Sequence, residues 1–384
     1  MKFPKFLSKK SAIPAYLSQT YYQPIGKPVW SSREYKKFAD EAYIKNVIAH
    51  RCVKTIAASA SSIRWQVTRD GVHLPTHPLQ KLLSRPNPTN GGVEFFEALY
   101  SYKLIGGNAY MLAVIPKDGT PAELYSLRPD MVQVIAGKQS LPLGYRYTNG
   151  DKYTDYKVNR ATGQCAVLHL KTFNPLDNWY GLSSIEAAAY SIDQHNQAGE
   201  WNQALLQNGA RPSGALIVKQ GNGADTLSDE QYQRLKTQID DEYSGAMNAG
   251  RPILLEGGLE WKEMSLSPKD MDFMNVKNSA ARDIALAFGV PTQMLGIPGD
   301  NTYSNFAEAR ISLWEQTILP FVDNICDSLN NWLVPMFGAE FGNISLTYDK
   351  DAISALAPRR DAVWKRVKDA DFLSDDDKRS MVKI

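Results

Sequence analysis

The chain has 384 residues, of which 43% are hydrophobic and 22% are charged, and its formal net charge is +2. A chain of this length buries roughly three quarters of its unfolded surface and usually folds into two or more domains. The composition is that of a globular protein, and the small net charge excludes a protein that binds nucleic acid through a uniformly basic surface.

Neither a membrane segment nor a targeting signal is expected. The longest uncharged run, residues 284–299, is interrupted by glycine and proline and is too short to span a bilayer. The N-terminus lacks the apolar stretch of a signal peptide. The three cysteines, Cys52, Cys165 and Cys326, lie far apart in apolar surroundings without metal-ligand spacing. They are expected to be buried thiols of a reducing compartment.

The N-terminal segment is basic and rich in proline. Residues 1–37 carry eight Lys or Arg against a single acid, Glu34. We expect residues 1–30 to form an extended, flexible arm. The arm is either a solvated tail or a segment that grips a neighbouring subunit or an acidic partner.

The next 150 or so residues alternate helical and strand-like patterns, which predicts an α+β domain over residues 31–180. Paired glycines or prolines end its helices, and Gly, Asp, Asn and Pro turns separate its strands. The helices are expected over 41–63, 77–83 and from Thr89 or Asn90 to Gly106, and the strands over 63–67, 109–115, 123–127, 131–135, 145–147, 153–158 and 166–170.

Two long helices flank a small module in the middle of the chain. The first, 182–208, is polar nearly all round from Asp193 to Gln203. Such a helix bridges, packs against copies of itself or faces water. The second helix, 268–288, has a proline in its first turn. The module between them is predicted to hold a strand, a capped amphipathic helix and a hairpin, over 214–218, 228–243 and 252–264.

The most distinctive stretch follows Phe288, where Gly289 and Pro291 end the second helix. A loop rich in Gly, Pro, Asp and Asn leads to a long helix from Ser304 or Asn305 to Val334. The loop is either an ordinary surface connection or a mobile segment that offers amides and hydroxyls to a polyanion. Proline at position 320 predicts a kink in the long helix. A strand at 344–348 and two short helices complete the chain.

Catalytic motifs are missing from the sequence. It contains no G-x-x-x-x-G-K-[ST] phosphate loop, no G-x-S-x-G elbow and no H-E-x-x-H pair. His73 and His77 are four residues apart, but Pro75 between them breaks the helix that would bring them to one metal. Cys52 and His50 point in different directions on a helix, so a nucleophilic pair is not expected.

The acidic run Asp240-Asp241-Glu242 is the remaining candidate for a metal site. Adjacent positions of a helix point in different directions. A solvated acidic helix end is therefore favoured over a Mg²⁺ site, and we expect neither a metal nor a cofactor.

The residues resemble the tailed-bacteriophage portal protein family, of the type found in long-tailed lambdoid-like phages and in gene transfer agents. The resemblance covers about nine tenths of the chain, and it rests on an ordered set of motifs rather than on any single one. The motifs are His77-Pro78-Leu79 with Leu82-Leu83 and Pro86-Asn87; Gly106-Gly107-Asn108-Ala109-Tyr110; Leu127-x-Pro129-x-x-Val132; Tyr180-Gly181-Leu182-Ser183; Asn208-Gly209-Ala210-x-Pro212-x-Gly214; and Phe288-Gly289-Val290-Pro291 with Leu295-Gly296 and Thr302-Tyr303-Ser304-Asn305.

The resemblance implies a portal-type subunit with an α/β wing, a two-helix stem, a small α/β clip, a long kinked spine helix and a short α-helical crown. It divides the chain as arm 1–30, wing 31–180, first stem helix 181–210, clip 211–264, second stem helix 265–290, channel loop 291–303, spine helix with a strand returning to the wing 304–348, and crown 349–384.

The resemblance also implies a non-enzymatic role. Such proteins form a homo-oligomeric ring, normally of twelve copies, at one capsid vertex of the virion, and are assembled in the bacterial cytoplasm. The ring passes double-stranded DNA without reading its sequence. Its expected partners are a large terminase, which hydrolyses ATP, a head–tail adaptor, and the major capsid protein or scaffold; no membrane is involved.

The resemblance places the channel-lining residues in the loop and on the second stem helix, and the docking residues on the clip helix. The channel residues are expected to be Gln293, Asn301, Thr302, Tyr303, Lys277 and Arg282, and the terminase or adaptor docking residues Arg234, Lys236, Asp240 and Asp241.

Two departures from the family pattern bear on this interpretation. The C-terminal region is short, which implies a reduced crown. The stem helices contain few Lys or Arg, but a channel through which DNA slides should not bind it tightly, since many phosphate contacts would add salt-sensitive affinity.

Two alternatives remain open at this point. The first is a metal-dependent nuclease that uses Asp240, Asp241 and Glu242. The second is a monomeric peptide-binding adaptor that uses the β-rich first domain.

Overall fold

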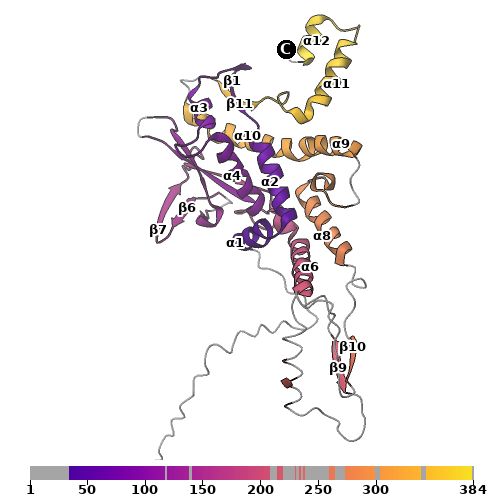
Figure 1. Ribbon diagram of the computed structural model, residues 1–384. Helices are drawn as coiled ribbons and strands as arrows, with labels where there is room; N and C mark the ends of the chain where they lie inside the picture. The colour runs from indigo at the N-terminus through magenta and orange to yellow at the C-terminus, as the bar shows by residue number, and fades with distance from the viewer. Residues whose placement is uncertain are drawn as a thin grey trace, which may run out of the picture.

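The computed structural model describes residues 34–116, 119–137, 141–207, 214–218, 230, 233–234, 237, 259–263, 273–298, 303–338 and 343–382. Helices and antiparallel sheets are mixed within this part, which confirms the α+β prediction. Figure 1 shows a body with most of its strands on one side. The helices α6 (Ala189–Gln207) and α8 (Phe273–Phe288) extend from this body side by side, and α11 and α12 lie at the opposite end.

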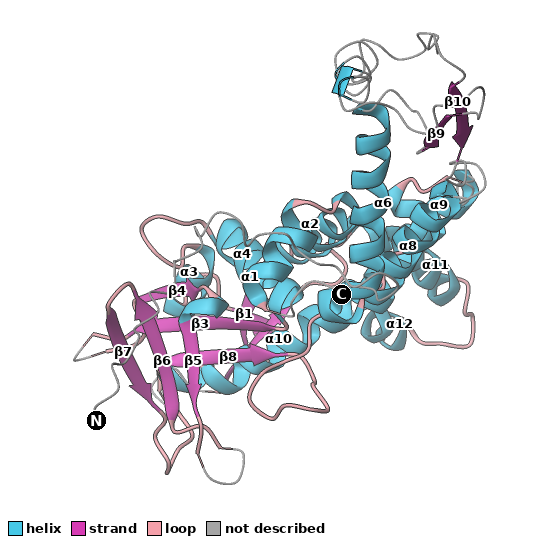
Figure 2. Cartoon of the chain, turned by 90° about the horizontal axis from the view of Figure 1, so that it is seen from below, coloured by secondary structure: helices cyan, strands magenta, loops and turns pink. Residues whose placement is uncertain are grey.

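The predicted strands of the first domain are present and pair antiparallel in three small sheets (Figure 2). Successive side chains of a strand point to opposite faces, so the first sheet packs against the helices with one face and against the second sheet with the other. In the first sheet β3 (Asn108–Val114) lies between β4 (Glu123–Leu127) and β8 (Val167–Lys171). In the second sheet β6 (Gly144–Asn149) lies between β5 (Val132–Ile135) and β7 (Lys152–Lys157). In the third sheet β1 (Trp65–Arg69) lies between β2 (Val72–His73) and β11 (Ile344–Tyr348).

The third sheet joins the two ends of the described chain. Trp65 of β1 pairs with Tyr348 of β11, and their rings meet edge to face with centroids 6.0 Å apart. The main core lies between these strands and the helices α2 (Val47–Ser61), α3 (Pro78–Ser84) and α4 (Gly92–Gly106). Leu99 and Tyr100 of α4 are fully enclosed in it. The strand 344–348 was predicted, and the resemblance implied that it returns to the first domain, where it pairs with β1.

The helix predicted over 41–63 is wrong in its first part. A short helix α1 (Tyr35–Lys37) runs into a π-helical segment, Phe38–Ile44, and α2 begins only at Val47. Asn46 separates the two because its backbone is extended and its Oδ1 accepts from the amides of Ile48 (3.1 Å) and Ala49 (3.0 Å). An asparagine in this role is a strong helix start.

The helix predicted over 182–208 is split into α5 (Ser184–Ala187) and α6, with the interruption at Ala188. The hydroxyl of Ser183 caps α5 by accepting from the amide of Glu186 (2.9 Å). The strand β9 (Gly214–Val218) pairs with β10 (Leu259–Glu263). Residues 252–255, the predicted partner of β10, lie outside the described residues, as does most of the helix predicted over 228–243.

The long helix predicted from Ser304 or Asn305 begins at Tyr303 and is made of three parts. A π-helical segment, Trp314–Ile318, separates α9 (Tyr303–Leu313) from α10 (Leu319–Trp332). The irregularity predicted at Pro320 is therefore centred upstream of the proline. Proline has no N–H, and its ring conflicts with the carbonyl four residues earlier, a conflict that wider π-type hydrogen bonding avoids.

The cysteines largely follow the prediction. Cys52 and Cys165 are buried, whereas Cys326 is half-buried. Burial raises the pKa of Cys52 to about 12 and that of Cys326 to about 11, so both thiols stay protonated and unreactive at neutral pH. None of the helices described has the length and apolarity that a membrane crossing requires.

Candidate nucleic-acid interface

The helices α6 and α8 form one closely packed pair (Figure 1). Alanines at positions 280, 281 and 285 of α8 are buried, and such small side chains let two helix backbones approach each other. Ser191 of α6 also donates a hydrogen bond to Asp283 of α8 (3.4 Å). The pair therefore holds together through packing within one subunit.

The polar half of α6 is partly internal, which agrees with the first of the three expectations for it, namely that it bridges to another part of the chain. Asp193 and His195 are both 7% exposed. Nδ2 of Asn46 donates to Nδ1 of His195 (3.2 Å) and to Oδ1 of Asn196 (2.9 Å), and Asn196 in turn donates to the carbonyl of Glu41 (2.9 Å). Sequence analysis missed this network because its partners lie about 150 residues apart.

The His195 ring is neutral in this arrangement. An amide nitrogen can only donate, so Nδ1 of His195 must be the acceptor and carries no proton. Burial, together with the positive charge of Lys277, lowers the pKa of His195. The positive charge of Lys277 on α8 therefore acts on His195 of α6.

The turn after α8 is built on Gly289. Its φ is +65°, a left-handed conformation, and the amides of Gly289 and Val290 bond back to Leu286 O (3.0 Å) and Ala285 O (2.9 Å). This double hydrogen bond is the Schellman termination of a helix. Oγ1 of Thr317 donates to the carbonyl of Gly289 (2.6 Å), which ties the turn to the π-helical segment.

We predict that Gly289→Ala lowers the free energy of unfolding by about 1–2 kcal/mol for the left-handed backbone alone, and by more because the new Cβ would lie 2.8 Å from Oγ1 of Thr317. Gly296→Ala is a matched control, since its φ is +69° and nothing lies within 4 Å of its added Cβ. Denaturant unfolding of both variants checks the prediction. Equal losses would mean that the contact with Thr317 is unimportant.

The first part of the loop predicted over 291–303 has regular structure, as an ordinary surface connection would. Residues Thr292–Leu295 form a 3-10 turn, and Val290 and Ile297 on either side are 3% exposed. Nη2 of Arg282 donates to the carbonyl of Pro298 (3.0 Å). Residues 291–298 are thus held on their own subunit, and the connection to α9 that lies outside the described residues shortens to 299–302.

The predicted site residues differ in their exposure, and several of them lie outside the described part of the chain. Gln293 is half-buried in the 3-10 turn, and Lys277 and Arg282 are partly exposed on α8. Tyr303 is the first residue of α9, and its side chain is not among those described. Arg234 is exposed. The predicted residues that lie outside the described part are Asn301, Thr302, Lys236, Asp240 and Asp241, together with Glu242 of the nuclease alternative.

The exposed face of α8 is one feature that sequence analysis missed. Val276, Ser279, Asp283 and Leu286 are all exposed, and Leu286 is 80% exposed. Their spacing of three or four residues places them in one row. Asp283 is the one charged residue of this row. Val276 and Leu286 do not belong to the buried apolar face that the helical periodicity of the sequence identifies.

Two of the family-like motifs meet in the first domain at Asn108. Oδ1 of Asn108 accepts from the amide of Gly181 (2.7 Å) and from Nε2 of His169 (2.9 Å), while its Nδ2 donates to the carbonyl of Gly106 (2.7 Å). The segment that leads into α5 and α6 is thereby attached to the central strand β3. His169 also stacks on Tyr110, with ring centroids 4.4 Å apart.

The environment of His169 predicts loss of stability in acid. Burial, with help from Lys171 and Lys103, lowers the pKa of His169 to about 3. In the unfolded chain this histidine has its ordinary pKa near 6.5. At a pH between these two pKa values, the unfolded chain therefore binds a proton at His169 that the folded chain does not bind. The contribution of His169 to the free energy of unfolding is therefore fully present above pH 6.5 and is lost as the pH falls toward 3. By pH 5 the loss is about 1–2 kcal/mol.

We expect His169→Gln, which keeps a donor for Asn108, to reduce the fall in melting temperature between pH 7 and pH 5. His73→Gln, at an exposed position of β2, is the control and should leave that fall unchanged. An identical pH response in the wild type and in His169→Gln would contradict the prediction.

No group of three or more His, Cys, Asp or Glu side chains that could hold a metal ion is found within the described ranges. His77 has a structural role, since its Nδ1 accepts from the amide of Leu79 (3.1 Å) and caps α3. The acidic run 240–242 lies outside those ranges.

Comparison with known proteins places this architecture. The phage portal protein family matches residues 48–382. An uncharacterized protein of Rickettsia bellii (strain RML369-C) is 48% identical over 346 residues, which span 89% of this chain and 87% of the relative. The portal protein of Enterobacteria phage HK97 is 24% identical over 325 residues, 82% of this chain and 72% of that protein.

A solved structure extends the likeness to the whole fold. A chain from the neck of a native gene transfer agent (GTA) particle, computed with C12 symmetry, superposes with a TM-score of 0.70 at 42% identity, and the match covers 94% of this chain and 96% of that chain. The ordered motifs, the paired helices α6 and α8 and these matches agree, and the chain belongs to the phage portal protein family.

Proposed function

We propose that copies of this chain assemble into a ring at one capsid vertex, where the ring serves as the head–tail connector and as the conduit for double-stranded DNA. The observation that supports this most directly is the neck chain with C12 symmetry, since its 42% identity extends over 94% of this chain and 96% of that chain. Twelve copies is the number that this symmetry favours. The particle is put together in the bacterial cytoplasm.

The proposal assigns the division into arm, wing, stem, clip, spine and crown given above. The stem is the pair α6 and α8, which extends from the body (Figure 1). The clip is the module that contains β9 and β10, and its helix, with Arg234, Lys236, Asp240 and Asp241, receives the large terminase and later the head–tail adaptor. The wing and crown contact the capsid protein or scaffold.

The DNA-facing surface is formed by the exposed row on α8 and by the end of the connection to α9. Gln293, Asn301, Thr302 and Tyr303 offer neutral polar groups, which contact phosphate without reading bases. Lys277 and Arg282 contribute positive charge, and the guanidinium of Arg282 also donates to the carbonyl of Pro298. We therefore assign to them a positioning role and not tight binding of phosphate.

Membership in the portal family points to a structural role and not to catalysis. ATP hydrolysis belongs to the separate terminase in this proposal. The nuclease alternative makes a distinct prediction, namely metal-dependent cleavage of DNA that Asp240→Ala abolishes. The monomeric adaptor alternative requires one subunit per particle in solution.

Negative-stain imaging and native mass measurement of the purified chain test the proposal. We expect closed rings with a central hole and a mass that corresponds to twelve subunits or close to it. Purified protein that remains a single copy at every concentration would overturn the proposed function.

A further inference from the structure

The C-terminal hairpin lacks a core of its own. It consists of α11 (Ala357–Lys368) and α12 (Asp375–Val382), and no residue of α11 is buried. Trp364, Phe372 and Met381 are 43%, 86% and 56% exposed. Isolated helices of this length are marginal in water and need packing to persist. Exposed aromatic side chains on such a hairpin therefore indicate a surface that another molecule covers.

Among the described residues, a few polar contacts attach the hairpin to its own subunit. Arg359 forms ion pairs with Glu315 (3.3 Å) and Glu308 (4.0 Å), and Arg360 donates to the carbonyl of Asp351 (3.0 Å). All of these contacts lie at the first turn of α11. The distal part of the hairpin is left free to meet a neighbour.

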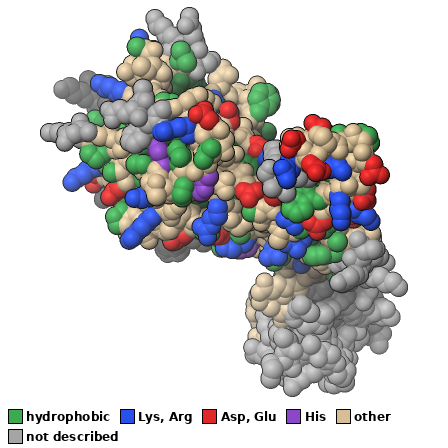
Figure 3. Space-filling view, turned by 90° about the horizontal axis from the view of Figure 1, so that it is seen from above, with side chains coloured by type: hydrophobic (Ala, Val, Ile, Leu, Met, Phe, Trp, Pro, Cys, Tyr) green, Lys and Arg blue, Asp and Glu red, His purple; other side chains and the backbone are tan. Residues whose placement is uncertain are grey.

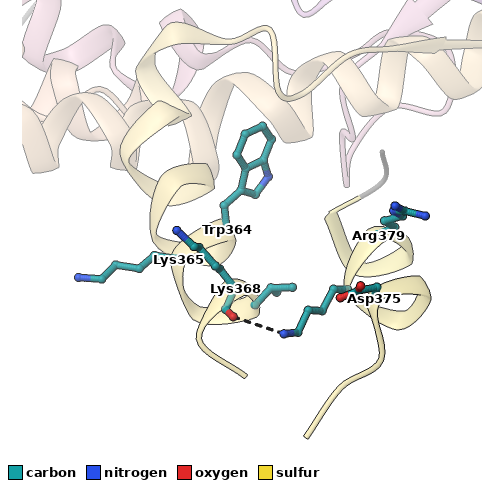
Figure 4. A pocket seen from close by; sticks show the side chains of 7 residues that line it. Trp364, Lys365, Lys368, Asp375 and Arg379 are labelled. Carbon is teal, nitrogen blue, oxygen red and sulfur yellow. Dashed lines mark hydrogen bonds between the residues drawn. The ribbon is translucent and has the colours of Figure 1, made fainter. Parts of the chain in front are cut away.

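A groove of about 600 Å³ runs between the two helices. Figure 4 shows Trp364, Lys365 and Lys368 on the α11 side and Asp375 and Arg379 on the α12 side. Val367 adds an apolar surface, and Lys378 crosses the gap to donate to the carbonyl of Lys368 (3.4 Å). Four cationic side chains against one carboxylate favour an occupant with an apolar anchor flanked by acids.

The chain itself contains a segment of this chemistry. Asp369-Ala370-Asp371-Phe372 lies in the connection between α11 and α12. Phe372 does not line the groove of its own subunit and remains 86% exposed. Within the described part of the chain, Asp369 and Asp371 form no ion pair, and neither do Lys365 and Lys368 of the groove.

Both signs of charge are therefore present at this end of one molecule. Seen from above, acidic, basic and hydrophobic side chains lie close together there (Figure 3). A surface that displays both an anchor and a matching groove at different places suits a head-to-tail contact between identical copies. Repetition of such a contact closes a ring when the rotation between copies allows it.

We propose that Phe372 of one copy inserts into the α11–α12 groove of the next copy, with Asp369 and Asp371 facing Lys365 and Lys368. The contact rests on the proposed ring, and it names residues by which successive copies hold each other at the C-terminal end. The hairpins then form a continuous belt. Their apolar side chains become covered in the assembly.

Co-expression of two differently tagged chains tests the contact. One carries Phe372→Cys and the other Val367→Cys, and rings purified by both tags are oxidised mildly. We expect a disulfide-linked dimer that joins one tag to the other, because the two introduced thiols are on different chains and meet across the contact between adjacent copies. Met381→Cys replaces Phe372→Cys in the matched control, since Met381 lies on the same hairpin but does not line the groove.

A charge exchange supplies a second readout. Lys365→Glu with Lys368→Glu should weaken assembly about tenfold or more, and adding Asp369→Lys with Asp371→Lys in the same chain should restore it. Phe372→Ala should weaken each contact roughly tenfold to a hundredfold, as expected for loss of a buried aromatic anchor. Mass photometry during dilution measures all three variants.

The outcomes separate this contact from the ring itself. Rings with Phe372→Cys and Val367→Cys that give no more tag-to-tag dimer than the Met381→Cys control would overturn the docking of Phe372 and leave the ring intact. Rings of Phe372→Ala and of the charge variants that resist dilution as well as the wild type would do the same. A wild-type chain that forms no ring would overturn both proposals.

Discussion

Replacing Gly181 by alanine is expected to lower the free energy of unfolding by about 3 kcal/mol or more, because overpacking against backbone atoms cannot be relieved by side-chain motion. An added Cβ would meet the carbonyl oxygen of Gly107 and would lie 2.6 Å from the amide nitrogen of Thr172 and 2.8 Å from its oxygen. The chain would have to move apart where Asn108 joins the two segments. A melting curve of the purified variant measures the effect.

The control is the same substitution at Gly199. This glycine lies inside α6 and has nothing within 4 Å of an added Cβ. Alanine there should stabilise the helix by about 0.5–1 kcal/mol, since glycine is a poor helix former. A Gly181→Ala variant with the same melting temperature as the wild type would contradict the prediction, because it would show that the backbone around Asn108 moves apart at little cost in free energy.

Introducing lysine on the exposed row of α8 is expected to have the largest effect on function. Val276 is 43% exposed, and Ser279 is exposed in the same row. In the proposed ring, Val276→Lys with Ser279→Lys would be repeated in every copy and would create phosphate contacts along the proposed conduit. Each such contact steepens the salt dependence of DNA affinity by about 0.9 in a log–log plot and opposes sliding.

We therefore expect particles with this double variant to contain at least about tenfold less nuclease-protected DNA. A tenfold change requires only about 1.4 kcal/mol of additional binding free energy between the ring and DNA. Val276→Gln with Ser279→Gln is the control, because it adds polar side chains of similar length without charge. Quantitative amplification of protected DNA per particle measures the outcome. Equal amounts of protected DNA in particles of the lysine and glutamine variants would show that the exposed row of α8 does not line the proposed conduit.

The two alternatives to a portal make different demands on the same residues. A nuclease would lose activity with Asp240→Ala, whereas a portal would lose terminase docking and would show no cleavage of its own. An adaptor would be unaffected by lysines on α8. The α8 and Asp240 variants together therefore distinguish a conduit from both alternatives.

Local signals were enough to predict most of the elements of the fold. Gly107 and Gly289 end helices because a left-handed residue at a helix end is a property of a few consecutive residues. The alternation in β3 and the buried stripe of α10 likewise depend on neighbouring positions, and the ordered motifs indicated the family. The loop after Pro291 was also located from the sequence, although not its conformation.

Contacts between distant residues decided the rest. Asn46 ends one helical segment and starts another while it binds His195, about 150 residues away, so its role is visible only when α6 is in place. That Arg282 faces DNA stays a prediction, whereas its hydrogen bond to the carbonyl of Pro298 is visible only in the folded chain. Sequence periodicity reports which face of a helix is apolar and not what that face meets. Burial of polar groups, the anchoring of residues 291–298 and the groove between α11 and α12 all arise from the tertiary fold, because each needs segments that only folding brings together.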